Sequence, residues 1–288
     1  MNEVPIRNLA YVETPFGNIH YRTSSAPEYA TTPIVAIHGW LDNAATFEKL
    51  RTYSNWDENF IALDLPGHGA SDWLTDYAFL QWLPVLQSFL DAMQIQNCHL
   101  VGHSLGGSIA LMYAAFDSRI SSVVAIDAIG PWAQTGEDWV DDFWASSSQR
   151  LKKRPEARTR SLKTLCEARK FALGYLNDEM AEILVKGGAE EVEGGWKFTH
   201  DPRLKNKALM RCTENHVHAA FRKISCPVLT IRAEGGYPVP EGLIEKRLEQ
   251  ISNNTYKSLP GHHHLHLSHA IEVGRLIEAF WNDNGIEI

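Results

Sequence analysis

A serine with a glycine two residues away on either side is the part of this sequence best suited to do chemistry. The pentapeptide GHSLG spans residues 102–106, between an apolar run at 99–101 and small and apolar residues at 108–115. This context predicts a sharp turn between a strand and a helix, from which the serine Oγ projects. Side chains larger than glycine at those two positions would collide with the strand and the helix. The helix N-terminus favours developing negative charge, so we predict that Ser104 is a nucleophile.

A serine needs a base to become a nucleophile, and histidines gather near the C-terminus in PGHHHLHL (260–267). In hydrolases with this serine turn the chain order is serine, acid, histidine, and the histidine lies in such a late loop. The spacing G-x-H-x-x-H-L, usual in serine hydrolases, picks His263 as the base. We expect His262, His264 and His266 to be packing or surface residues. Adjacent histidines rarely converge on one ion, and no carboxylates flank them in sequence, so we expect no metal.

A loop after an early apolar run could stabilise the oxyanion. Residues 34–37 are apolar and β-branched, and His38-Gly39-Trp40 follows them. In hydrolases an N–H from this loop acts together with the N–H that follows the nucleophile. We therefore predict that the backbone N–H groups of Trp40 and Leu105 form the oxyanion hole, each contributing on the order of 3 kcal/mol to the transition state.

The elements that would position these residues alternate between strands and helices. A β-hairpin is predicted near the N-terminus around Gly17. Short apolar runs that are typical of buried strands lie at 34–37 and 60–63, and further strands are expected at 99–101, 122–126, 227–231 and 255–259. Helical spacing of apolar residues occurs at 77–93, with Pro84 inside it, and at 108–115, 243–251 and 268–281. This alternation predicts an α/β fold with a mostly parallel central sheet and helices on both faces.

The pattern changes between residues 133 and 222, where strand-like runs disappear. Helices are expected at 139–150, 158–173 and 178–185, with Asn177 capping the last, and 187–196 is rich in turn residues. We predict a helical cap insertion at 133–222 in a core formed by 1–132 and 223–288. Four aromatic residues at its start are candidates for an apolar acyl pocket: Trp132, Trp139, Phe143 and Trp144.

Composition excludes several classes of protein. The chain has 27 basic and 35 acidic residues in 288, a formal net charge of −8, which gives no electrostatic reason to bind nucleic acid or anionic lipid. No run of apolar residues is long enough for a membrane span, and residues 1–18 lack the apolar region of a signal peptide. The four scattered cysteines form no CxxC pair. We expect a cytoplasmic protein without a cofactor.

These motifs together resemble the α/β-hydrolase superfamily. Within it, the chain is similar to the serine hydrolase-like proteins in HGWLDNAATF (38–47), LDLPGHGASD (63–72), GHSLGG (102–107), GGWKFTHDPRL (194–204) and GHHHLHL (261–267). The resemblance implies the α/β-hydrolase fold, a cap over the site and cleavage of a small-molecule ester. Haloalkane dehalogenases and epoxide hydrolases differ, because they have an aspartate in place of Ser104 and the dehalogenases have an asparagine in place of Trp40.

The acid is where the chain departs from the common pattern. Many α/β-hydrolases have it about five residues after the strand expected at 227–231, and that position is Gly236. Asp127 ends the strand after the nucleophile helix, where a minority of the superfamily carries the acid. Glu234 lies on the loop that usually carries it. A triad acid must accept the second N–H of the base; we favour Asp127 and keep Glu234 as the alternative.

The sequence therefore predicts a serine hydrolase, with carboxylesterase activity on small to medium esters through an acyl-enzyme on Ser104. Two alternatives remain at this point. One is a serine-dependent hydrolase of C–C bonds, which shares the scaffold. The other is a non-catalytic homologue that binds a ligand, which the missing carboxylate at position 236 keeps open.

Overall fold

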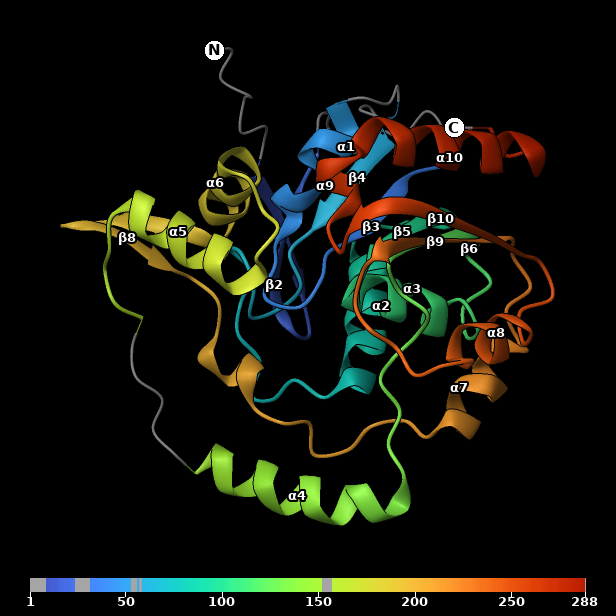
Figure 1. The fold of residues 1–288 in the computed structure, drawn as a ribbon, viewed down its shortest axis with the longest axis horizontal. Coiled ribbons are helices and arrows are strands. Elements are labelled where there is room, and N and C mark those ends of the chain that lie inside the picture. The colour runs from blue at the N-terminus through green and yellow to red at the C-terminus, as the bar shows by residue number, and fades with distance from the viewer. Residues whose placement is uncertain (1–8, 24–31, 53–55, 57–58, 152–156, 288) are drawn as a thin grey trace.

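One sheet of eight strands forms the centre of the protein (Figure 1). The computed structural model describes residues 9–23, 32–52, 56, 59–151 and 157–287. No signal peptide is expected in residues 1–18, and the first eight of these residues lie outside the described part of the chain. Among the described residues, no helix is both long and apolar enough to cross a bilayer.

The strand order in the sheet is β1-β2-β4-β3-β5-β6-β9-β10. The hairpin of β1 and β2 is antiparallel, and β2 pairs antiparallel with β4. All other pairings are parallel. The strands are β1 (Leu9–Thr14), β2 (Gly17–Arg22), β3 (Ile34–Ile37), β4 (Phe60–Leu63), β5 (Cys98–His103), β6 (Ile120–Ile126), β9 (Val228–Gly235) and β10 (Asn254–His262). The central strands β3, β4 and β5 are buried along their whole length, as expected for a parallel sheet covered on both faces.

Helices cover both faces of the sheet (Figure 1). On one face lie α2 (Trp82–Ala92) and α3 (Leu105–Tyr113), and their apolar side chains share a core with Val35, Ile37 and Leu100. On the other face lie α1 (Glu48–Thr52), α9 (Leu265–Ser268) and α10 (Ala270–Asp283). They pack over a second core. Along the chain, the short 3-10 helix η1 (Ala44–Phe47) precedes α1, and α8 (Leu243–Leu248) connects β9 to β10.

The segment between β6 and β9 forms a layer outside the sheet, at the lower and left side of Figure 1. Its helices are α4 (Gly136–Arg150), α5 (Leu162–Leu173) and α6 (Asp178–Gly188). Asn177 caps α6, because its side chain accepts a hydrogen bond from the Met180 N–H, as its position before that helix predicted. The 3-10 helix η4 (Pro202–Lys205) and α7 (Glu214–Phe221) follow, and α7 packs against α3 and α8.

Several expected elements need correction. The segment expected to be without strands contains an antiparallel hairpin of β7 (Ala189–Val192) and β8 (Gly195–Phe198). Its strands have only four residues each and are half exposed, so they lack the apolar run used to find strands. The helix α7 was not expected at all. The helix expected at 77–93 is divided into the 3-10 helix η3 (Phe79–Gln81) and α2, with Pro84 in the first turn of α2, where a missing N–H costs nothing.

The core beneath the sheet can be tested with Phe89, which is fully buried on α2 and meets the Tyr21 ring edge-on. We expect Phe89→Ala to lower the free energy of unfolding by about 3–5 kcal/mol, because it leaves a cavity in a close-packed core. Urea denaturation followed by circular dichroism measures this loss.

The matched control is Phe171→Ala, because Phe171 is 93% exposed on α5. That variant should change the stability by no more than about 0.5 kcal/mol. Equal losses in the two variants would contradict the assignment of Phe89 to the core.

Candidate active site

Ser104 lies in a strained turn between β5 and α3. Its backbone φ is 53° and its ψ is −113°, in a region that non-glycine residues rarely occupy and that costs about 1–3 kcal/mol. A Cβ on Gly102 would collide with the backbone of Gly106, and a Cβ on Gly106 would collide with the carbonyl of Ile37. The two glycines therefore let the helix start directly against the strands, which is the steric reason the spacing predicted.

His263 and Asp127 meet behind this turn. His263 lies in the segment between β10 and α9, and Asp127 follows the last residue of β6. The distance from His263 Nδ1 to Asp127 Oδ2 is 2.5 Å, and both residues are buried. The carboxylate can only accept, so Nδ1 carries the proton and Nε2 is the ring nitrogen left to act as a base. Among the described residues, no hydrogen bond joins Ser104 Oγ to His263; such bonds often tighten only when substrate binds.

The carboxylate of Asp127 occupies the place of the usual acid. A Cβ on Gly236 would lie 2.5 Å from both carboxylate oxygens of Asp127. The N–H of Ala233, near the end of β9, donates to Asp127 Oδ1 at 3.1 Å, and the N–H of Tyr237, next to Gly236, donates to Oδ2 at 3.2 Å. The glycine at position 236 therefore accommodates a carboxylate supplied by the neighbouring strand.

The surroundings of Asp127 favour its charged form. Burial alone would raise the pKa of this carboxyl, but the hydrogen bond and charge of His263 and the charge of Arg232 lower it overall. The Arg232 guanidinium lies 2.6 Å from Asp127 Oδ1 and also donates to the Tyr237 carbonyl. Asp127 is thus an ionised acceptor at neutral pH, as a triad acid must be.

The structure keeps Glu234 away from this arrangement. Glu234 is exposed at the end of β9, and no hydrogen bond or ion pair between it and His263 occurs among the described residues. Of the two carboxylates proposed from the sequence, only Asp127 contacts His263.

The loop after β3 passes beside Ser104. A Cβ on Gly39 would lie 3.2 Å from the Ser104 Cβ, so any larger residue there would crowd the nucleophile. The Trp40 indole N–H donates to the Leu204 carbonyl of η4 at 3.1 Å. His38 and His68 support the loop, because their Nε2 atoms accept from the N–H groups of Leu65 and Leu41. The oxyanion role of the Trp40 and Leu105 N–H groups stays a prediction.

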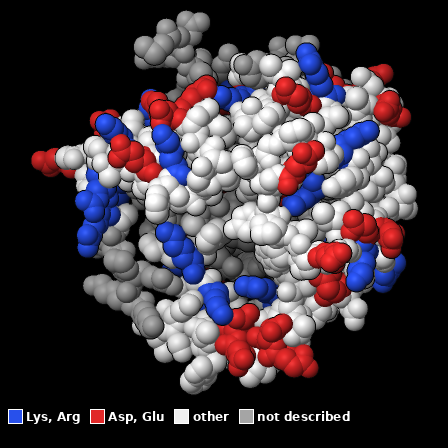
Figure 2. All heavy atoms as spheres, in the orientation of Figure 1, with Lys and Arg blue, Asp and Glu red and all other residues white. Residues whose placement is uncertain are grey.

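The aromatic residues proposed for an acyl pocket are exposed. Trp132 precedes α4, and Trp139, Phe143 and Trp144 lie on it; their exposed fractions range from 41 to 75%. The Trp139 and Phe143 rings lie 5.6 Å apart, centre to centre. In the orientation of Figure 1, this face of the molecule is hollowed just above α4 (Figure 2). Acyl contact by these four residues stays a prediction.

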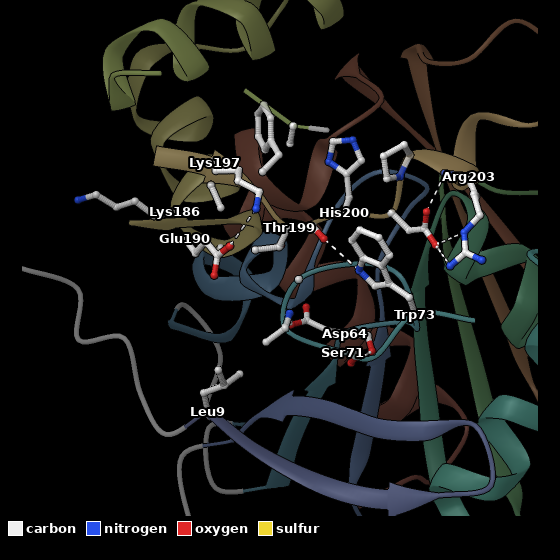
Figure 3. Close-up of a pocket in the computed structure, with 18 of the residues that line it drawn as sticks. Leu9, Asp64, Ser71, Trp73, Lys186, Glu190, Lys197, Thr199, His200 and Arg203 are labelled. Carbon is white, nitrogen blue, oxygen red and sulfur yellow. Dashed lines mark hydrogen bonds and ion pairs between the residues drawn. The ribbon is translucent and has the colours of Figure 1, made fainter. Parts of the chain in front are cut away.

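A cavity of about 820 Å³ lies elsewhere, beside the β7–β8 hairpin. Figure 3 shows Trp73 and His200 in it, and the Trp73 indole donating to the Thr199 carbonyl at 3.2 Å. Neither Ser104 nor His263 lines this cavity. It is therefore separate from the site that the geometry assembles around Ser104.

Comparisons with known proteins agree with this architecture. Residues 34–275 match the Alpha/beta hydrolase family. The chain belongs to this family. It is 27% identical to a serine hydrolase-like protein of Danio rerio, over 86% of this chain and 81% of the relative. A probable serine hydrolase of Drosophila melanogaster is 28% identical, over 89% and 82%.

Solved structures show the same fold as this alpha/beta hydrolase. A hypothetical protein from Pseudomonas aeruginosa superposes with a TM-score of 0.86 at 27% identity, covering 95% of this chain and 99% of that one. The thioesterase domain from the curacin biosynthetic pathway superposes with a TM-score of 0.82 at 19% identity, covering 94% and 99%. The expected α/β-hydrolase fold and the resemblance to serine hydrolase-like proteins are confirmed.

Two residues of this hydrolase's site escaped the sequence analysis. Arg232 lies in the buried strand β9, and an arginine within the apolar run VLTIRA (228–233) signals a buried partner. Asp42 lies 3.3 Å from His264, although the two residues are 222 positions apart in the chain. Only the fold brings these two together, so no local pattern could have found the pair.

The steric role of Gly236 can be tested by Gly236→Ala. The added Cβ would displace the Asp127 carboxylate, so we expect the rate of labelling of Ser104 by a fluorophosphonate to fall at least about tenfold. Intact mass spectrometry over time measures this rate.

Gly136→Ala is the matched control, since nothing lies within 4 Å of a Cβ at that position. It should label at the wild-type rate. If Gly236→Ala also labelled at the wild-type rate, the carboxylate would not need the space that glycine leaves.

Proposed function

We propose that this hydrolase is a carboxylesterase that acts on small to medium ester substrates through an acyl-enzyme on Ser104. The observation that carries the proposal is the 2.5 Å contact between His263 Nδ1 and Asp127. It accompanies a serine in a strained strand-to-helix turn, and the combination is what acyl transfer by a serine requires. An ester is the proposed substrate because the resemblance to serine hydrolase-like proteins implies ester cleavage.

In the proposed reaction, His263 Nε2 takes the proton from Ser104 Oγ as the oxygen attacks the ester carbonyl. The N–H groups of Trp40 and Leu105 stabilise the oxyanion. His263 then gives its proton to the leaving alcohol, which departs and leaves an ester on Ser104. Water, deprotonated by His263, attacks that ester and releases the carboxylic acid and free Ser104.

Asp127 has two tasks in this reaction. It holds His263 with Nδ1 protonated, so that Nε2 is available to accept a proton. Its negative charge also stabilises the imidazolium that forms during both proton transfers. Arg232 and the two backbone N–H groups hold the carboxylate in place, so little reorganisation is needed when charge develops.

The nucleophile is tested by Ser104→Ala with short p-nitrophenyl esters. We expect kcat to fall at least a thousandfold, since loss of the nucleophile in such enzymes costs up to about 10⁶. The melting temperature should not fall, because the strained serine is not needed for packing. Ser88→Ala, on α2 and away from the site, is the control and should keep wild-type kcat. Undiminished hydrolysis by Ser104→Ala would refute the assignment.

The acid is tested by comparing Asp127→Asn with Glu234→Gln in the same assay. We expect Asp127→Asn to lower kcat by about 10³–10⁴, because the amide favours the wrong tautomer of His263. Glu234→Gln should stay within about twofold of wild type, because an exposed carboxylate that does not contact the base adds little. The reverse order of effects would make Glu234 the acid.

A further inference from the structure

Four buried residues form a second cluster next to the candidate active site. Asp42 comes from the loop after β3, and His103 immediately precedes Ser104. His264 and His266 follow His263 in the chain. Their exposed fractions do not exceed 4%. One ring nitrogen each of His103 and His266 and one carboxylate oxygen of Asp42 all lie within 4.8 Å of one another. His264 Nε2 lies 3.3 Å from Asp42 Oδ2.

In each histidine of the cluster, one ring nitrogen forms a hydrogen bond to an oxygen outside the cluster. The partners are the His263 carbonyl for His103 Nε2 at 2.9 Å, the Tyr175 hydroxyl for His264 Nδ1 at 2.7 Å, and Thr46 Oγ1 for His266 Nε2 at 2.7 Å. The opposite nitrogens face inward. His103 Nδ1 and His266 Nδ1 are buried without a hydrogen-bond partner, whereas His264 Nε2 pairs with Asp42 Oδ2. An outer nitrogen fixed by an oxygen partner and a free inner nitrogen, as in His103 and His266, are the arrangement of metal-binding histidines.

His103 shows why the centre of the cluster needs a cation. A carbonyl oxygen can only accept, so His103 Nε2 carries the proton that it shares with the His263 carbonyl. In the neutral ring, Nδ1 then presents a lone pair to Asp42 Oδ2, 3.9 Å away. Two electron-rich atoms facing each other in a buried site repel unless a positive charge lies between them.

The inner atoms of Asp42, His103 and His266 lie near the spacing of the ligands of a small tetrahedral ion. With bonds of about 2.0–2.1 Å, two ligand atoms on a tetrahedral zinc are about 3.3–3.4 Å apart. His103 Nδ1 lies 3.9 Å from Asp42 Oδ2, and the ligand atoms of the three residues lie within 4.8 Å of one another, so a modest inward shift of the side chains lets them share one ion. Arg169 lies 3.8 Å from the other oxygen, Asp42 Oδ1, where it can orient a carboxylate that binds through Oδ2.

We propose that Asp42, His103 and His266 bind one divalent transition-metal ion, with zinc as the preferred ion. Imidazole and carboxylate ligands suit zinc, and three buried protein ligands leave one of its four positions for water. His264, paired with Asp42 Oδ2, holds the carboxylate in place. This inference departs from our expectation of no metal, which rested on the lack of a carboxylate near the histidines in sequence. The fold supplies that carboxylate from Asp42.

The ion would tie together three segments that carry the candidate active site. His103 adjoins the nucleophile, Asp42 follows the proposed oxyanion loop, and His266 lies three residues after the proposed base. A metal bound there would fix the segment 263–266 against the turn at Ser104 without contacting the substrate.

The test is metal binding by the whole chain, produced without a polyhistidine tag. After chelation with EDTA and reloading with zinc, gel-filtered protein should hold about one zinc ion per chain by elemental mass spectrometry. Cobalt(II) loading should give the intense visible bands of a tetrahedral site, and zinc should raise the melting temperature of the stripped protein. These readouts do not depend on esterase activity.

Asp42→Asn and His266→Gln should each lose the bound zinc, whereas His262→Asn should keep it, because His262 is exposed and belongs to the same run of histidines. Stripped wild-type protein that takes up no zinc and gives no cobalt bands would overturn the proposal, even if the variants fail to fold. Equal zinc contents in wild type and in folded Asp42→Asn and His266→Gln would also overturn it, since the metal would then bind at surface histidines.

Discussion

The contact between Asp127 and His263 is the interaction on which the rest of the candidate site depends. It joins the carboxyl end of β6 to the segment after β10, two parts of the chain that β9 separates in the sheet. It depends on the end of β9 and the loop after it, where Ala233 and Tyr237 donate their N–H groups to the carboxylate and position 236 is glycine. Arg232, from the same strand, balances the buried charge. The usual place for the acid is thus filled by a carboxylate from the adjacent strand end, and the base meets it there.

Neighbouring residues in two short motifs contribute to two different sites. In the serine turn, Ser104 is the proposed nucleophile, whereas His103 points toward Asp42 and the buried cluster. In the histidine segment, His263 contacts Asp127, whereas His264 contacts Asp42. The proposed metal site and the proposed triad therefore lie next to each other and share their backbone. Any substitution that moves one of these segments should therefore alter the geometry of both sites.

The sequence predicted the parts of the protein that local pattern determines. The strands at 34–37 and 60–63 agree with the structure residue for residue, because a short apolar run in a parallel sheet covered on both faces is buried along its whole length. The hairpin at 189–198 was missed, since its strands are short and half exposed. For the site, chain order and spacing were enough to select Ser104 and His263. The choice between Asp127 and Glu234, the part played by Arg232 and the approach of Asp42 to the histidines all depend on contacts between strand ends, which local sequence does not encode.

The most direct test of the account is proton NMR of the His263 Nδ1–H in protein with ¹⁵N-labelled histidine. An N–H that donates to a buried carboxylate resonates far downfield of the amide protons. The account predicts such a resonance in the wild-type protein, its retention in Glu234→Gln and its loss in Asp127→Asn. An unchanged downfield resonance in Asp127→Asn would contradict the account, because His263 would then be held by a different acceptor.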